Sequence, residues 1–169
     1  FGRSQSLTKF NSPKIILPIL SVEPRYAYDD ANIVVTGGGN GPYYMIRPRP
    51  GVAISNYYML AVLNHPLSEA FVRTNTSPFR GGYYSHGKQF IENLPVPIAA
   101  EVQRTEIEER VATLIAAIDE LAATRIPHER TRKEREVAAL RSEIENRMSA
   151  VFELSEADMH TVQAVPVPA

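Results

Sequence analysis

The stretch that divides this chain is Leu94-Pro95-Val96-Pro97, where a region rich in Gly and Tyr gives way to a region with neither. All nine Gly, all eight Tyr and ten of the thirteen Pro lie in residues 1–100. Gly and Pro punctuate short elements, whereas a Gly-free stretch rich in Ala, Glu, Arg and Leu is typical of long helices. The composition predicts a module of short elements over 1–100, a helical hairpin with a short C-terminal helix over 101–160, and a disordered tail over 161–169.

On the N-terminal side of the junction we expect short strands and helices. The apolar, β-branched run of residues 14–20 predicts a strand, in which Pro18 favours a sheet edge or a bulge. The other expected elements are strands at 26–28, 33–36 and 43–46, a Gly-rich loop at 37–42, helices at 55–64 and 67–74, and a helical turn at 87–94. Ser55 or Asn56 is the expected N-cap of the first helix.

On the C-terminal side, apolar residues recur at helical spacing in two stripes. Thr105-Glu106-Ile107-Glu108 predicts a capping box at the start of the first helix. A break at 124–127 separates the stripes, and Pro127 suits a first helical position. Two amphipathic helices joined by a short break favour an antiparallel pair. Residues 155–158 are expected to begin a further short helix. The fold class is therefore α+β: a small sheet with short helices, followed by the hairpin.

Composition also limits the class of protein. The net charge of −1 conceals a split, since residues 1–100 carry nine Lys/Arg and five Asp/Glu (+4) while 101–169 carry nine and fourteen (−5). No apolar run has the length of a transmembrane helix, and no signal peptide is evident. The absence of Cys excludes disulfides and thiolate metal sites and is compatible with a reducing cytoplasm. A first residue other than Met indicates a piece of a longer polypeptide.

Enzymatic motifs are missing from the sequence. The loop at 37–41 lacks the Gly spacing of a dinucleotide fingerprint and the Gly-Lys-Ser/Thr of a phosphate loop, so a hairpin loop is the simpler interpretation. The four histidines are never paired at i, i+4, and there is no Gly-x-Ser-x-Gly elbow. We therefore expect no catalytic residue and no metal ligand in this chain.

What the sequence does offer is a recognition surface. Residues 77–88 combine cations, aromatic rings and Gly, and Arg47-Pro48-Arg49 adds a stiff cationic pair. Arg binds guanine edges or phosphates, and Tyr bonds phosphate or stacks on bases, so contact with DNA or RNA is indicated. The alternative is structural: Tyr83 or Tyr84 in the core, and Arg80 paired with a backbone carbonyl.

The segment leading into the junction also carries a family likeness. Arg80-Gly81-Gly82-Tyr83-Tyr84-Ser85-His86-Gly87-Lys88-Gln89-Phe90-Ile91-Glu92-Asn93-Leu94-Pro95-Val96-Pro97 resembles the end of the C-terminal specificity domain of TaqI-like and type IIG adenine-specific DNA methyltransferases. Weaker likenesses to the same domain lie at 14–16, 24–26, 43–48, 58–64 and 143–158. The Pro-rich junction with its long helix is similar to type I restriction specificity subunits. Arg147-Met148-Ser149 and Phe152 depart from the family's apolar, Tyr-containing ending, which affects packing more than readout.

This resemblance implies a target-recognition domain with a small twisted mixed sheet, bound to double-stranded DNA and fused to an upstream methyltransferase domain of the same polypeptide. The catalytic Asn/Asp-Pro-Pro-Tyr/Phe motif is absent, so catalysis and S-adenosylmethionine are expected upstream, with no cofactor in this fragment and a fused nuclease left open. The expected readout residues are Arg47, Arg49, Arg80, Tyr83 and Tyr84, and the expected phosphate contacts are Lys88, Lys14, Arg25 and Arg73. The alternative is a protein-interaction module that forms a homodimer through the helices without touching DNA.

Overall fold

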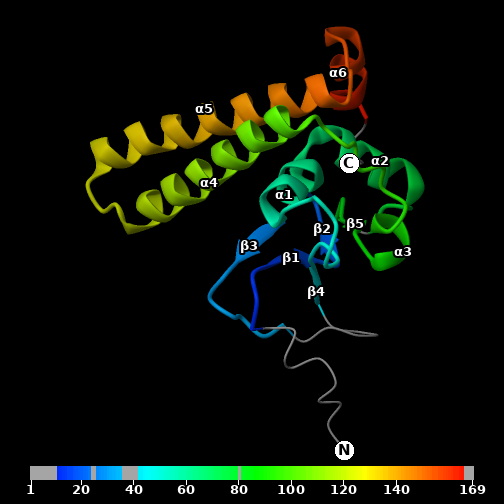
Figure 1. The fold of residues 1–169 in the computed structure, drawn as a ribbon, viewed down its shortest axis with the longest axis horizontal. Coiled ribbons are helices and arrows are strands. Elements are labelled where there is room, and N and C mark those ends of the chain that lie inside the picture. Colours follow the sequence, from blue (N-terminus) through cyan, green and yellow to red (C-terminus); the bar gives the residue numbers. More distant parts are fainter. Residues whose placement is uncertain (1–10, 24–25, 36–41, 80, 166–169) are drawn as a thin grey trace, which may run out of the picture.

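A short helix, α1, lies between a small sheet and a long helical hairpin (Figure 1). The computed structural model describes residues 11–23, 26–35, 42–79 and 81–165. The main sheet has the order β3-β1-β4, formed by Ala27–Asp29, Lys14–Pro18 and Tyr43–Ile46, and β2 (Leu20–Ser21) pairs with β5 (Tyr84–Ser85). These strands and the helices below confirm the α+β class.

Every described strand pairing is antiparallel, where a mixed sheet was expected. The short link from β1 to β3 explains part of this, because a parallel pair needs a crossover of a dozen or more residues. Pro18 ends β1 opposite Tyr43 of β4, beyond the last residue that pairs with β3, Ile16. β1 is the central strand, so the expected edge strand is wrong. Pro18 is tolerated because it lies at the end of β1, where its missing N–H costs no ladder bond on the β3 side.

The strand expected at 33–36 is wrong for residues 33–35, and residue 36 lies outside the described residues. The Asp29 carboxylate at the end of β3 accepts hydrogen bonds from the backbone N of Ala31 (3.1 Å) and of Ile33 (3.1 Å). This side-chain bonding replaces a strand ladder by a turn, and Asn32 within it has a φ of 59°. The loop predicted at 37–42 is described only at Pro42.

The short helices form where the sequence predicts them. Ser55 caps α1 (Asn56–Asn64) by accepting from the backbone N of Tyr58 at 3.1 Å. His65 separates α1 from α2 (Pro66–Asn75), and α3 (Lys88–Ile91) occupies the expected turn after β5. None of the described helices combines the length and apolar character needed to cross a membrane.

The predicted hairpin is confirmed as the antiparallel pair α4 (Glu101–Ala123) and α5 (Pro127–Val151), with Pro127 in the first turn of α5. The predicted capping box is wrong, because α4 begins at Glu101 and Thr105 lies inside it. Glu108 accepts instead from the hydroxyl of Ser55 at 2.7 Å and so reaches the N-cap of α1. The last helix, α6 (Glu156–Gln163), begins in a Ser155/Asp158 capping box and extends into the stretch expected to be a disordered tail.

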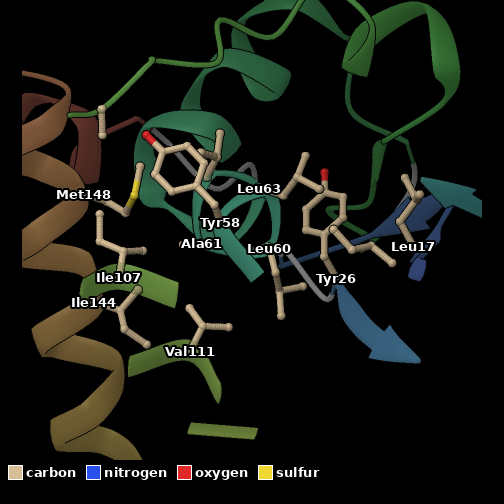
Figure 2. Packing of buried hydrophobic residues seen from close by; sticks show 13 residues of the cluster. Leu17, Tyr26, Tyr58, Leu60, Ala61, Leu63, Ile107, Val111, Ile144 and Met148 are labelled. Carbon is tan, nitrogen blue, oxygen red and sulfur yellow. The ribbon is translucent and has the colours of Figure 1, made fainter. Parts of the chain in front are cut away.

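One hydrophobic core joins the two halves of the chain across the junction. Tyr58 of α1 is 1 % exposed and meets Ile107 of α4 and Met148 of α5 in a single buried cluster (Figure 2). The same cluster contains Leu17 of β1. The Tyr58 hydroxyl donates to the backbone O of Pro97 at 3.0 Å. Helix α1 therefore ties the sheet, the junction and the hairpin into one packed unit.

Candidate nucleic-acid interface

The stretch from Ala31 to Ile91 has an unusual charge pattern. It carries five Lys/Arg and a single carboxylate, that of Glu69. Glu69 is 6 % exposed, so its charge is turned inward. The described surface of this stretch therefore presents cations without any exposed carboxylate of its own. Such a surface attracts a polyanion and repels cations.

Glu69 is neutralised by two partners inside the fold. Its Oε2 lies 2.8 Å from Nε2 of His86, and its Oε1 accepts from Nε of Arg73 at 2.8 Å. Arg73 also donates through Nη2 to the backbone O of Val22 at 2.9 Å. Burial acts to raise the pKa of the Glu69 carboxyl, but the hydrogen bonds and positive charges of His86 and Arg73 outweigh it, so the pKa is lowered. The network thus holds a buried carboxylate in its charged form.

This network assembles from elements far apart in the sequence. Glu69 and Arg73 are one helical turn apart on α2, the spacing at which helix side chains meet. β5 brings His86 to them by pairing with β2, and the backbone N of His86 donates to the O of Ile19 at 2.7 Å. The Arg73 guanidinium lies 5.2 Å from the centroid of the Tyr84 ring. The network therefore fixes the C-terminal part of the predicted recognition segment (77–88) to α2.

Immediately before β5 the chain makes a tight turn. The backbone N of Phe79 donates to the O of Tyr83 at 2.7 Å, and the N of Gly82 donates to the O of Phe79 at 3.2 Å. Gly81 and Gly82 have φ values of 85° and 74°, in a backbone region that residues with a Cβ rarely adopt. The Gly pair of the sequence thus has a conformational role in forming the turn.

Several predicted contact residues lie on the surface. Arg47 and Arg49 are exposed in the segment after β4, where Nη1 of Arg47 donates to Oγ of Ser12 at 2.8 Å. The Tyr83 ring is 45 % exposed. Lys88, at the start of α3, has a side chain 81 % exposed and 3.7 Å from Glu92. These four residues are positioned to meet a ligand from solvent.

Two other predicted contact residues, Tyr84 and Lys14, are buried, and a third, Arg73, is largely covered. Tyr84 is 3 % exposed and lies beneath Arg73, whose own side chain is 11 % exposed. Lys14 is fully buried and forms an ion pair with Asp29 of β3. In this fold their side chains are held by internal contacts, and their contact with DNA stays a prediction. Arg25 and Arg80 lie outside the described residues.

The exposed candidates form two groups on different sheets. Arg47 follows Ile46, which pairs with Ile15 near the start of β1, whereas Tyr83 adjoins β5, which pairs with Ser21 in β2. Ile15 and Ser21 are six positions apart in the chain. The two groups are therefore carried by neighbouring sheets.

Comparison with known proteins identifies the family of this domain. A model of the TaqI-like C-terminal specificity domain matches residues 2–96, which is more than half of the chain. The chain belongs to this family. The match ends at the junction, within the Leu94–Pro97 stretch where the composition changes.

A curated relative gives the setting in which such a domain occurs. The chain is 32 % identical over 98 residues to the type II restriction enzyme and methyltransferase RM.Eco57I of Escherichia coli. The alignment covers 57 % of this chain and 10 % of the relative, so the chain corresponds to about a tenth of that protein. This specificity domain is therefore similar to one part of a much larger restriction and methyltransferase protein.

Sequence reasoning missed the internal partners of this surface. The sequence analysis does not identify Glu69 and His86 as partners. Glu69 is the only carboxylate in a stretch whose other charged residues are all cations, and this pattern could have indicated an internal ion pair. Phe79 was noted only as part of a mixed segment. Among the described residues no group of three or more His, Asp or Glu is arranged to hold a metal ion.

Proposed function

We propose that residues 1–100 of this specificity domain recognise a short sequence in double-stranded DNA for an adenine-specific DNA methyltransferase of a restriction-modification system. The fragment performs no catalysis itself. An upstream domain of the same polypeptide supplies the chemistry with S-adenosylmethionine, and a fused endonuclease is consistent with the printed name of the relative. The system operates in the cytoplasm, where the DNA it modifies is found.

The observation that carries this proposal is the one-sided charge of the stretch from Ala31 to Ile91. Its only carboxylate is buried against Arg73 and His86, while Arg47, Arg49 and Lys88 are exposed. DNA carries a phosphate every 3.4 Å on each strand, and cations that neutralise phosphates supply most of the sequence-independent affinity. The family match adds the role of specificity to this electrostatic preference.

The chemistry of the exposed side chains assigns them to different DNA contacts. Arg47 and Arg49 can donate paired hydrogen bonds to guanine edges, and Tyr83, with Arg80 beside it in the sequence, can reach bases from the other group. Lys88 is a point charge suited to phosphate. The two groups therefore offer two sets of contacts to one DNA ligand.

The helical hairpin sets the position of this surface relative to the rest of the polypeptide. Tyr84, Arg73 and Lys14, predicted as contacts, serve on this proposal as internal supports for the contact residues. The hairpin helices contribute a mostly acidic surface, with fourteen Asp/Glu and nine Lys/Arg in residues 101–169, and are unsuited to phosphates.

An exchange of specificity domains in the full-length enzyme tests the proposal. Residues 1–100 in one variant, and the whole chain in a second, are replaced by the matching segments of a family member that methylates a different sequence. The methylated sites are then read from modified genomic DNA. The proposal predicts that the target sequence follows the exchanged segment. If both exchanged enzymes stay active and still methylate the original sequence, the proposal is wrong.

Binding measurements separate DNA recognition from the alternative of a protein-interaction module. Full-length enzyme should bind its target duplex with an affinity that falls steeply as salt rises, and Lys88→Ala should reduce the slope of log K against log salt by about 0.9 for one lost phosphate contact. Lys133→Ala, at the far end of the hairpin, is the matched control and should leave the slope unchanged. If the module only dimerises through its helices and never touches DNA, Lys88→Ala would leave the slope unchanged.

A further inference from the structure

The turn before β5 presents two aromatic side chains to solvent. Phe79 and Tyr83 face each other in an antiparallel bridge, and residues opposite one another in such a bridge project from the same face. Phe79 is 53 % exposed and Tyr83 is 45 % exposed. The Phe79 ring has no polar atom to justify this exposure, so the pair forms a small apolar patch within a stretch, 70–91, that contains no Asp or Glu.

Contacts within the fold support the pair. Gly81 and Gly82 have positive φ, and a Cβ at Gly81 would lie 3.5 Å from the Tyr83 ring. The next residue, Tyr84, is buried beneath Arg73, which Glu69 holds from the other side. Groups held in place before binding lose little conformational entropy when a ligand arrives.

The surroundings select the chemistry of the ligand. Residues 70–91 contain no Asp or Glu, and the side chain of Lys88, 81 % exposed, lies on the surface five residues beyond Tyr83 and 3.7 Å from the carboxylate of Glu92. A cationic rim favours a polyanion, yet the Phe79 ring gains nothing from a phosphate oxygen. The bases of DNA offer apolar faces and the thymine methyl group, against which aromatic rings pack favourably. An aromatic pair within a cationic rim thus matches nucleobases flanked by phosphates.

We propose that Phe79 and Tyr83 pack against nucleobases of the target duplex and act as specificity-determining residues of this domain. The inference rests on the proposed function and adds Phe79, together with an apolar mode of contact, to the cationic readout. Glu69, Arg73 and His86 are positioning residues on this view, because they hold the turn without touching DNA.

The test uses full-length enzyme with the variants Phe79→Ala, Tyr83→Phe and Lys88→Ala, and the control Ile126→Ala, which removes a similarly exposed apolar side chain (47 %) between the two long helices. Phe79→Ala should weaken binding of the target duplex by roughly 10-fold or more, the range of one aromatic base contact, while the dependence of binding on salt keeps its slope. Lys88→Ala should lower that slope. Tyr83→Phe keeps the aromatic ring, so its affinity should stay within about twofold of the wild-type enzyme. Ile126→Ala should stay within the same limit.

Two DNA substitutions identify which apolar feature is contacted. Replacing thymines of the target by uracil removes the methyl group, and 2-aminopurine fluorescence reports unstacking of a base. The proposal predicts that one of these signals changes on binding of wild-type enzyme and that Phe79→Ala abolishes the change.

The outcomes separate this inference from the function on which it rests. If wild-type enzyme discriminates its target but Phe79→Ala binds and discriminates equally well, the inference is wrong and the proposed function stands. If Phe79→Ala lowers the salt slope as Lys88→Ala does, or weakens association with the rest of the polypeptide and not with DNA, the base contact is wrong. If wild-type enzyme prefers no DNA sequence, both proposals fail. Thermal denaturation of each variant reports folding, and loss of binding in a variant that melts with the wild-type enzyme supports the base contact.

Discussion

Acidification from about pH 7.5 to about pH 5 is expected to destabilise this fold through His65. The ring is 2 % exposed, its Nδ1 accepts from the backbone N of Leu67 at 3.2 Å, and its Nε2 lies 3.0 Å from Oγ of Ser149 on α5. Burial lowers the pKa of His65 to about 4, although a hydrogen bond with the Glu145 backbone acts in the opposite direction. A proton on Nδ1 would bury a charge and remove the N-cap of α2.

The size of the effect follows from the difference between the folded and unfolded states. An imidazole in an unfolded chain titrates near pH 6.5, so between about pH 6.5 and the folded-state pKa of about 4 the unfolded chain binds more protons. The free energy of unfolding therefore falls as the pH drops through that window. With those two pKa values, the free energy of unfolding is almost unchanged by His65 at pH 7.5 and is lowered by about 2 kcal/mol at pH 5.

Urea denaturation of the wild-type chain and of His65→Asn at the two pH values measures this loss. Asn is the matched replacement because it caps helices and does not titrate. All other titrating groups contribute equally to both proteins, so the difference between their pH dependences isolates His65. The reasoning is refuted if His65→Asn loses as much stability on acidification as the wild-type chain.

Further predictions concern single contacts of the fold, each measured by urea denaturation at neutral pH. Met148→Ala should lower the free energy of unfolding by about 3 kcal/mol, because its fully buried side chain fills the core between the halves, while exposed Val102→Ala should change it by less than about 0.5 kcal/mol. Lys14→Met should cost about 3 kcal/mol by leaving the buried Asp29 carboxylate without its cation, and adding Asp29→Asn should restore part of the loss. Ser55→Ala should cost about 1 kcal/mol by removing the cap of α1 and the bond to Glu108.

Local sequence signals predict the helices of this domain well. The N-cap at Ser55, Pro127 at the start of α5 and the turn at α3 depend on neighbouring residues, which a single sequence displays. Thr105 shows the limit of that reasoning. Its spacing to Glu108 fits a capping box, but Glu108 instead bonds Ser55, which is 53 residues away, and the helix begins earlier. A local pattern cannot reveal that a distant side chain competes for the same carboxylate.

The sequence alone identifies the segment of the candidate interface but not which of its side chains are exposed. The segment from 77 to 88 was identified by its mixture of cations, aromatic rings and Gly. Tyr83 and Tyr84 are adjacent and identical in chemistry, yet one is exposed and the other buried, because successive strand residues point to opposite faces. Which face is inward depends on the pairing of β5 with β2, a contact between residues more than sixty positions apart.

The shared core has a consequence for how specificity is exchanged between such domains. Tyr58 belongs to residues 1–100 but is buried against Ile107 and Met148 of the hairpin, and its hydroxyl donates a hydrogen bond to Pro97 at the junction. A replacement of residues 1–100 therefore changes one side of a packed interface and leaves the other side unchanged. A packing mismatch there would lower the free energy of unfolding by a few kcal/mol, which is a large part of the total stability of a domain. Exchange of the whole chain keeps both sides matched. Of the two exchanged enzymes, the one that carries the entire unit should be the more stable, because its target surface arrives together with the helices against which it folds.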